Sequence, residues 1–510
     1  VGSTLFLPAQ AVVPTATSTA SVQSSLADGP AAKSKGGKGP EGFSAASRKL
    51  RKNVKTKAIV GHLRELEIVA ERYGDRAAGR QGYNASSRYL ESVLRRAGYD
   101  PQRQYFDFTY SELIAQQLTA GGDDIENNVM TGSPNTAPEG VTAELVQPAV
   151  VTGCDAAAWD GVDATGKIAL VSRGACTFAA KSVAAGEGGA LGTVIYNNAD
   201  GELNGTLGET PEGATPTTGI TQAAGQALVA QIAEGPVEAT LVLDQLIEER
   251  RTWNIVVETG RGRADNVVMM GAHLDSVQDG PGINDNGTGS ATLLETAVQL
   301  KKQTKRLDNK VRFAWWGAEE LGLLGSTYYV NDLVANDPRA LDDIAVYLNY
   351  DMVGSPNYRL GVYDADGSGE PTDAPVPAGS IETENAFREF FDKVGQPVVD
   401  TQFSGRSDYQ AFIFNEVAAG GLFTGADGVK TEEEVELFGG EAGITYDPNY
   451  HSADDNLANV NRTALTIMSN AIAHMTAELG ASTVAIDVPS GGRFKARRVP
   501  ASLPEGVSRR

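Results

Sequence analysis

Apolar positions along this chain repeat at two spacings, which separate predicted helices from predicted strands. Apolar residues at helical spacing occur in AIVGHLRELEIVAERYG (58–74) and YNASSRYLESVLRRAGY (83–99), each of which finishes close to a glycine. The following stretch, QRQYFDFTY (102–110), is rich in the aromatic residues that strands favour. This part of the chain therefore predicts two helices and then a strand.

From residue 246 onward, short apolar runs alternate with loops and helical patterns. Runs typical of buried strands are NVVMMGAHLD (266–275), KVRFAWWGAEE (310–320) and IAVYLNYDMVG (344–354). Near-continuous apolar strands that alternate with helices are typical of a parallel sheet covered on both faces. We therefore predict an α/β fold with a mostly parallel central sheet flanked by helices, built from residues 58–135 and 246–482.

Residues 136–245 have a different texture from the sequence on either side, which indicates a change of domain. Alanine, glycine and threonine become more frequent, and strand-like pieces appear in KIALVSRG (167–174) and GTVIYNN (192–198). This composition predicts a small domain of α+β or β-rich type. The only two cysteines, Cys154 and Cys176, both lie in it. In an exported protein they favour one disulfide, worth about 3 kcal/mol of stability for a loop of this size, and two buried free thiols are the alternative.

The two ends of the sequence lack a regular apolar pattern. Residues 12–57 are rich in Ala, Ser, Thr, Gly, Pro and Lys, which predicts a disordered or propeptide-like leader. Residues 1–11 read VGSTLFLPAQA and resemble the end of a secretory signal peptide with a small-x-small cleavage pattern. Residues 483–510 form a basic tail. We therefore expect a secreted, extracellular protein.

Charge and hydropathy exclude two classes of partner. The 510-residue chain carries a formal net charge of −22, whereas a nucleic-acid-binding protein would present a basic face. No run approaches the roughly 18 consecutive apolar residues that a membrane span needs. The sequence therefore predicts neither a nucleic-acid partner nor a membrane span, and it leaves the oligomeric state open.

Polar side chains follow the predicted strands, at the edge where parallel sheets bind ligands. His273 and Asp275 end the first of these strands, Glu319 and Glu320 the second, and Asp351 the third. Histidine combined with Asp and Glu, with no cysteine nearby, is a ligand set suited to zinc with open coordination positions. The sequence therefore predicts a zinc site at this edge.

Two loops add further candidates. Asp285 lies in the glycine-rich GINDNGTG, and His451 lies in NYHSADDN, where no helical or strand period explains them. The remaining histidines, His62 and His474, fall in helical patterns, which favours packing or surface roles. Each signal is weak alone, because a lone His-x-Asp or Glu-Glu pair is common in ordinary loops.

Five motifs in order resemble those of one peptidase group. AHLDS, GINDNGTG, WWGAEELGLLGS, NYDMVG and NYHSADDN are similar to motifs of the co-catalytic two-zinc aminopeptidases of peptidase clan MH, which include secreted bacterial leucine aminopeptidases and fungal aminopeptidase Y. The resemblance covers roughly residues 58–125 and 246–480. The stretch GKIALVSRGACTFAAKSVAAGEGGALGTVIYNN (166–198) resembles the protease-associated domain. That domain is a small module inserted into several exported peptidases, and the cysteines of this stretch and of GCDAAAW (153–159) just before it commonly pair, so the resemblance implies a Cys154–Cys176 disulfide.

The family resemblance implies a residue-by-residue site for two Zn²⁺ ions per chain. Asp285 would bridge both ions, His273 and Asp351 would complete one site, and Glu320 and His451 would complete the other. Three carboxylates would then offset much of the charge of the two ions. The implied cofactor is therefore a pair of zinc ions.

The same resemblance implies roles for three neighbouring residues. Glu319 would be the general base, and Tyr450 would donate a hydrogen bond to the developing oxyanion. Asp275 would accept a hydrogen bond from the far ring nitrogen of His273 and so fix its tautomer. Adjacent side chains point in different directions, which suits separate tasks for Glu319 and Glu320.

The substrate pocket has four candidates. The stretches TQFSGRSDYQAF (401–412) and AAGGLFTGAD (418–427) match regions that line the pocket in relatives. The candidate residues are Phe403, Arg406, Asp408 and Phe423. An ordinary loop followed by a buried strand is the alternative.

Peptide hydrolysis at neutral pH needs an activated water, charge stabilisation at the carbonyl oxygen and a proton for the leaving amine. Two metals about 3.5–4 Å apart supply the first two, and a carboxylate not bound to metal transfers the proton. The sequence therefore predicts a zinc metallo-aminopeptidase that acts on peptides with a free N-terminus through a water bridging two zinc ions. The alternatives are a carboxypeptidase, dipeptidase or glutaminyl cyclase of the same fold, and a non-catalytic receptor-like homologue. The complete ligand set weighs against the glutaminyl cyclase and against the receptor-like homologue.

Overall fold

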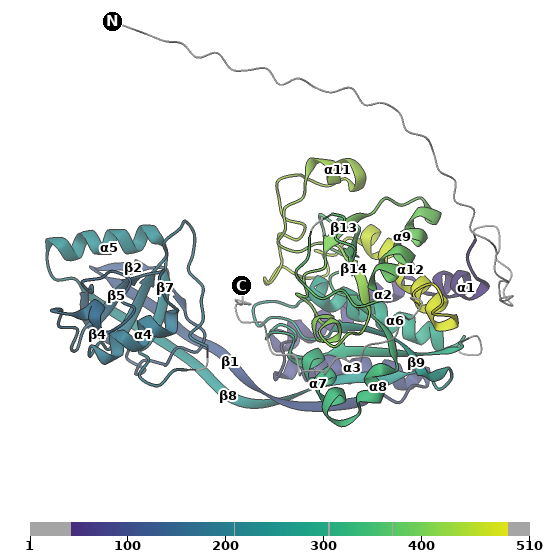
Figure 1. Cartoon of the computed structure of the whole chain (residues 1–510), viewed down its shortest axis with the longest axis horizontal. Helices are drawn as coiled ribbons and strands as arrows, with labels where there is room; N and C mark the ends of the chain where they lie inside the picture. Colours follow the sequence, from purple (N-terminus) through teal and green to yellow (C-terminus); the bar gives the residue numbers. More distant parts are fainter. Residues whose placement is uncertain (1–41, 209, 304–306, 370, 488–510) are drawn as a thin grey trace, which may run out of the picture.

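The chain forms two modules joined by a two-stranded ribbon (Figure 1). The residues described by the computed structural model are 42–208, 210–303, 307–369 and 371–487. The predicted signal remnant (1–11), residues 12–41 of the predicted leader and most of the basic tail lie outside the described residues. No helix among the described residues is long and apolar enough to cross a membrane.

The larger module is built on a mixed, mostly parallel sheet with the strand order β1-β8-β10-β9-β11-β14-β12-β13. Its strands are β1 (Gln102–Ala120), β8 (Glu238–Glu258), β9 (Arg263–His273), β10 (Asn309–Trp316), β11 (Ile344–Tyr350), β12 (Gly361–Asp364), β13 (Val399–Gln402) and β14 (Ala419–Phe423). Neighbouring strands from β10 through β14 run parallel, whereas β8 pairs with β10 and β12 with β14 antiparallel. The predicted fold class is confirmed.

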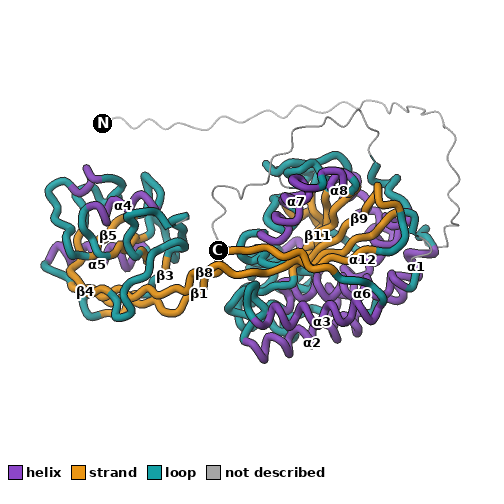
Figure 2. Tube along the Cα trace, turned by 90° about the horizontal axis from the view of Figure 1, so that it is seen from below, coloured by secondary structure: helices purple, strands orange, loops and turns teal. Residues whose placement is uncertain are grey.

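Helices cover both faces of this sheet (Figure 2). The larger layer consists of α1 (Ala45–Asn53), α2 (Thr56–Tyr73), α3 (Gln81–Ala97), α6 (Gly289–Lys301), α9 (Ser380–Val394) and α12 (Arg462–Ala481). The smaller layer consists of α7 (Leu324–Asn336), α8 (Pro338–Asp342) and α10 (Gln410–Ile413). Successive side chains of β9 point to opposite faces of the sheet and pack against both layers. Val268 and Met270 face the larger layer, and Met269 faces the smaller one.

Helix α1 corrects one expectation. Its residues were assigned to a disordered leader, yet Ser44 caps the helix by accepting a hydrogen bond from the Ser47 amide. Phe43 and Leu50 are buried in the main core, and α1 packs against α12. Residues 45–53 are therefore not disordered, because a short apolar stripe among the lysines and arginines packs against the core, and the propeptide-like alternative stays a prediction.

The smaller module has its own sheet and core. Its elements are β2 (Asp123–Ile125), β3 (Asn128–Val129), β4 (Val141–Val146), β5 (Ile168–Ser172), β6 (Gly192–Tyr196), β7 (Thr217–Ile220), α4 (Phe178–Glu187) and α5 (Gln222–Glu234). Strands β4 to β7 are parallel neighbours. A disulfide joins Cys154 to Cys176, whose Cα atoms are 5.9 Å apart, so the predicted pairing is present.

The ribbon that joins the modules consists of β1 and β8. They pair antiparallel from Gln102 opposite Val256 to Ala120 opposite Ala239, with one irregularity near Leu113. β8 pairs with β10 at one end and with β4 at the other, so one strand belongs to both sheets. The predicted boundary near residue 245 thus falls inside a strand.

Candidate active site

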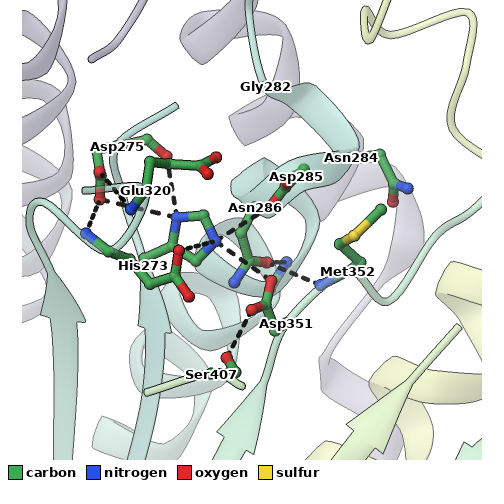
Figure 3. Close-up of polar contacts among 12 residues, drawn as sticks. His273, Asp275, Gly282, Asn284, Asp285, Asn286, Glu320, Asp351, Met352 and Ser407 are labelled. Carbon is green, nitrogen blue, oxygen red and sulfur yellow. Dashed lines mark hydrogen bonds and ion pairs between the residues drawn. The ribbon is translucent and has the colours of Figure 1, made fainter. Parts of the chain in front are cut away.

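Three of the five candidate metal ligands, His273, Glu320 and Asp351, lie where three neighbouring strands end (Figure 3). β9 ends at His273, Glu319 and Glu320 follow β10, and Asp351 comes directly after β11. These strands are parallel neighbours, so their carboxyl ends bring the side chains to one edge of the sheet. This is the edge that the sequence predicts.

Two clusters share Asp285. The Nε2 atom of His273 lies 3.1 Å from Oδ1 of Asp285 and 3.3 Å from Oδ1 of Asp351. The Nε2 atom of His451 lies 3.1 Å from Oδ2 of Asp285 and 3.0 Å from Oε2 of Glu320. Asp285 therefore presents one carboxylate oxygen to each cluster, and the five residues form two adjoining groups of three.

The donor set fits two divalent cations. Two ligand atoms about 2.0–2.2 Å from one zinc ion at tetrahedral angles lie roughly 3.3–3.6 Å apart, close to the separations above. Among the described residues, buried Oε1 of Glu320 has no hydrogen-bond partner, and buried Nε2 of His451 meets only the carboxylate oxygens of Asp285 and Glu320. Buried charged groups without partners are costly, and a bound cation would satisfy these atoms.

Charges within the clusters favour positive occupants. Burial and then the charge of Asp285 raise the pKa of Glu320 to about 7. Burial alone would lower the pKa of His451, but its hydrogen bonds to Asp285 and Glu320 outweigh this and raise the pKa to about 10. The raised pKa values favour the protonated forms of Glu320 and His451. Metal binding would displace these protons, as expected of a preformed metal site.

Glu319 lies beside the first cluster and belongs to neither group of three. Its Oε2 atom is 3.9 Å from Nε2 of His273, farther than the two carboxylates of that cluster. Burial, opposed by His273 and reinforced by Asp351 and Asp408, raises its pKa well above the usual value. A carboxylate in this place is available for proton transfer.

Asp275 meets the far ring nitrogen of His273 through its main chain. Its backbone oxygen lies 3.1 Å from Nδ1 of His273, while its carboxylate is 3.7 Å away. That carboxylate instead accepts the backbone amides of Glu319 and Glu320 at 3.3 and 3.4 Å. Asp275 therefore fixes His273 through its main chain and the two glutamates through its side chain (Figure 3).

Three non-glycine residues at the site adopt the left-handed backbone conformation. Ala318, Met352 and His451 have φ values of 57°, 54° and 56°. Such residues cost about 1 kcal/mol or more each and concentrate at functional sites. Ala318 precedes Glu319 and Met352 follows Asp351, so the unusual backbone turns the functional side chains inward.

Tyr450 completes the site beside His451. The two rings stack with centroids 3.8 Å apart, and Tyr450 lines the same pocket as the clusters. Burial and the nearby charges of Asp285 and Glu320 raise the pKa of its phenol. The hydroxyl is therefore a neutral hydrogen-bond donor at all ordinary pH values.

Arg76, which sequence reasoning missed, braces the loop between β9 and Asp285. It is fully buried, and its Nε atom donates to the backbone oxygen of Pro281 at 2.7 Å. Its two terminal nitrogens donate to the backbone oxygens of Leu274 and Gly282. One guanidinium thus holds three carbonyls of this loop, and no local sequence pattern marks such a role.

Asp455 holds the same loop from the opposite side. Its carboxylate oxygens accept the backbone amides of Asn284 at 2.8 Å and Asp285 at 2.9 Å. It lies four residues after His451, so the loop that supplies one histidine also positions the shared carboxylate. The acidic pair within NYHSADDN was the available signal.

Ser407 is a third contact that the sequence did not reveal. Its hydroxyl donates to Oδ2 of Asp351 at 2.6 Å and accepts the side-chain amide of Asn349 at 2.9 Å. Because the Ser407 hydroxyl binds Oδ2, the other carboxylate oxygen of Asp351, Oδ1, faces His273. Ser407 therefore orients this carboxylate.

A pocket of about 290 Å³ opens from the clusters. Arg406 and Phe423 line it, as predicted from the sequence. Phe403 does not, because its ring is fully buried against Tyr363 and Tyr409 beneath the wall. Asp408 is also buried behind the wall, where burial raises its pKa to about 8.

The remaining histidines and one further acidic group have partners within the protein. His62 contacts the hydroxyl of Tyr89 at 2.6 Å, and His474 lies 2.8 Å from the hydroxyl of Ser47, as packing roles require. The acidic group Asp364, Glu384 and Asp400 could also hold a cation by its spacing. Arg388 pairs there with both Glu384 and Asp400, so the protein supplies the balancing charge.

Comparison with known proteins identifies the family of the chain. The model of peptidase family M28 matches residues 254–476, and the PA domain model matches residues 141–228. Leucine aminopeptidase 2 of Trichophyton tonsurans is 42% identical over 463 residues, covering 90% of this chain and 91% of that protein. The chain belongs to peptidase family M28. This confirms the predicted peptidase family and the inserted protease-associated (PA) domain.

Similar proteins also occur in bacteria. A probable lipoprotein aminopeptidase of Mycobacterium tuberculosis is 41% identical over 435 residues, covering 83% of this chain and 85% of that protein. The structure of an aminopeptidase from Aneurinibacillus sp. strain AM-1 superposes with a TM-score of 0.65 at 27% identity, covering 84% of this chain and 96% of that one. A zinc aminopeptidase from Bacillus subtilis gives 0.60 at 27% identity, covering 85% and 98%.

Proposed function

We propose that this M28 peptidase is a zinc aminopeptidase that removes the N-terminal residue from peptides with a free amino terminus. The observation that carries the proposal is Asp285, whose two carboxylate oxygens each lie 3.1 Å from a different histidine. His273 and Asp351 would hold one zinc ion, and Glu320 and His451 the other. Relatives named leucine aminopeptidase support the exopeptidase assignment.

Bound zinc ions would activate a water molecule and polarise the carbonyl of the scissile bond. The protein's own residues supply the remaining steps. Oε2 of Glu319, the carboxylate outside both groups, takes the proton of the attacking water and delivers it to the leaving nitrogen. Burial of this carboxylate and the amides held by Asp275 fix its position.

Tyr450 would stabilise the charge that develops on the substrate's carbonyl oxygen. Its hydroxyl stays protonated, and its ring is fixed against His451. A neutral donor aimed at a developing oxyanion lowers the barrier because it needs no reorganisation during the reaction. The free amino terminus would lie among the cluster carboxylates, which favours exopeptidase over endopeptidase cleavage.

Metal removal tests the proposal. We expect the protein as purified to contain about two zinc ions per chain and to hydrolyse leucyl 4-nitroanilide. Chelation should abolish turnover and zinc should restore it, while N-acetyl-leucyl 4-nitroanilide should remain uncleaved throughout. A protein that binds no zinc, or that cleaves the blocked substrate equally well, contradicts the assignment.

We also propose that the protein acts outside the cell. The Cys154–Cys176 disulfide is typical of oxidising compartments. Detection of the intact disulfide by mass spectrometry in protein recovered from culture medium supports this location. Recovery only from the cell interior, with both thiols free, contradicts it.

A further inference from the structure

The pocket beside the metal clusters has a cationic wall that the catalytic residues do not use. Arg359 lines this pocket together with Phe423, Thr401 and Tyr446. Its guanidinium lies over the ring of Tyr446 at 4.7 Å and near that of Phe423 at 5.9 Å. Aromatic contacts on the guanidinium face leave its edge, which carries the N–H groups, to meet a ligand.

Arg359 has more donors than partners. A guanidinium carries five N–H groups. Its NH2 nitrogen donates to Oγ1 of Thr401 at 2.7 Å, and its NH1 nitrogen makes only a long contact of 3.5 Å with the hydroxyl of Tyr446. Buried Nε has no hydrogen-bond partner among the described residues. Because buried Nε is closed to a ligand, the spare N–H groups of the two terminal nitrogens are the donors suited to a planar acceptor such as a carboxylate.

The nearest carboxylate neutralises Arg359 only in part. Oε1 of Glu434 lies 3.8 Å from the guanidinium, beyond hydrogen-bond distance. The other oxygen of Glu434 already accepts the hydroxyl of Tyr446 at 2.6 Å and the amide of Thr431 at 3.0 Å. Glu434 therefore positions the wall while leaving the arginine able to take a stronger partner.

The charge balance of the pocket points the same way. Four carboxylates surround the metal clusters, and two divalent ions would balance them. Elsewhere, the lining carries Arg359, Arg406 and one acidic residue, Asp427, and Glu434 lies 3.8 Å from Arg359. Two arginines and two carboxylates balance there, so this part of the pocket is far less acidic than the whole chain, which has a net charge of −22. Its two arginines supply the positive groups that attract an anionic group of a ligand.

We propose that Arg359 recognises a carboxylate of the substrate and makes this enzyme selective for peptides that place one in the pocket. The inference rests on the proposed aminopeptidase function and extends it to a substrate class. Two substrate carboxylates have this chemistry: the side chain of an N-terminal glutamate, and the C-terminal carboxylate of a short peptide. Arg359 binds and orients this group and takes no part in bond cleavage.

The first test compares substrates that differ only in charge. With glutamyl and glutaminyl 4-nitroanilides, we expect wild-type kcat/KM to favour the glutamyl compound by about 10-fold or more, since charge-assisted hydrogen bonds are worth about 10- to 100-fold. Arg359→Met should reduce this ratio by about 10- to 100-fold, and Arg359→Lys should give an intermediate value. Arg72→Met removes an exposed charge on α2 and should leave the ratio unchanged.

A second arm identifies the source of the carboxylate. It compares leucyl-glycyl-glycine with its C-terminal amide in the same variants. A preference for the free acid that Arg359→Met removes assigns the pocket to the peptide's C-terminus, whereas a response only in the glutamyl arm assigns it to the N-terminal side chain. Unchanged ratios in both arms, with leucyl turnover retained, overturn the inference and leave the proposed function intact.

A binding measurement needs no variant. Free glutamate should inhibit wild-type turnover of leucyl 4-nitroanilide at least about 10-fold more tightly than glutamine does, or, if the C-terminal carboxylate is the one recognised, glycyl-glycine should inhibit more tightly than its amide. Equal inhibition within both pairs contradicts a carboxylate-recognising wall. Zinc-loaded protein that turns over no leucyl substrate removes the proposed function itself, a separate result.

Discussion

The inserted PA module gives its buried lysine hydrogen-bond partners within the protein, whereas the peptidase module gathers buried carboxylates around two histidines. In the PA module, buried Lys181 donates to the backbone oxygens of Thr152 at 2.5 Å and Gly174 at 2.8 Å. In the peptidase module, Asp285 lies 3.1 Å from both His273 and His451, and Glu320 lies 3.0 Å from His451. Buried carboxylates gathered around two histidines therefore distinguish the candidate site from the PA module.

The largest effect on the peptidase module is expected from Glu319→Gln. It removes the carboxylate proposed to move the proton and leaves both groups of three ligands intact, so kcat should fall by about 10²–10⁴-fold. Zinc content should not change. Turnover assays beside metal analysis test this, with Glu71→Gln on the exposed face of α2 as the matched control. Near-normal turnover would refute the assignment of the base.

Glu320→Ala tests the ligands themselves. It removes one of the three residues around His451, so bound zinc should fall from about two ions to about one, and turnover should fall with it. Glu433→Ala on the exposed face of α11 (Glu432–Phe438) is the control. Unaltered zinc content in Glu320→Ala would remove this residue from the metal site.

The PA module should respond to loss of its disulfide through stability instead. Replacing Cys154 and Cys176 together by serine should lower the free energy of unfolding of this module by about 3 kcal/mol. Calorimetry would show a shifted transition for the module, while zinc content and the main transition stay in place. A parallel loss of zinc would show that the modules are not independent.

Lys181→Met should give the smallest effect. It leaves the two carbonyls without their charged donor, which should destabilise the PA module by about 1–3 kcal/mol. Lys167→Met is the control, because that lysine forms only an exposed ion pair with Glu144 at 3.4 Å and should change stability by about 0–1 kcal/mol. Equal effects of the two substitutions would contradict the structural role of Lys181.

The sequence was sufficient for the sheet and for the residues that carry charge at its edge. His273, Asp285, Glu320, Asp351 and His451 could be found because each interrupts an apolar run or occupies a loop whose pattern explains nothing else. The apolar pattern of the sequence therefore located these residues, and the family resemblance assigned them to two metal sites. The grouping needed the family because no local pattern says which strand ends are neighbours.

The residues that brace the site could not be found in the same way. Arg76 is separated from the carbonyls it holds by about 200 positions, and Asp455 by about 170 from the amides it accepts. Both bind backbone atoms, so their partners carry no side-chain signature. Helix α1 was missed for a related reason, since its apolar residues became informative only once α12 lay against them.

The ribbon of β1 and β8 has a consequence for how the chain assembles. Asp107 pairs with Arg251 across 144 positions, and closing so long a loop costs about 4 kcal/mol of chain entropy. The inserted module lies wholly within that loop and brings Ala120 opposite Ala239 when it folds. If the inserted module forms first, it already holds β1 and β8 together at one end, and the remaining residue pairs can form in sequence from there. The inserted module then lowers the entropy cost of pairing these two strands in the peptidase sheet.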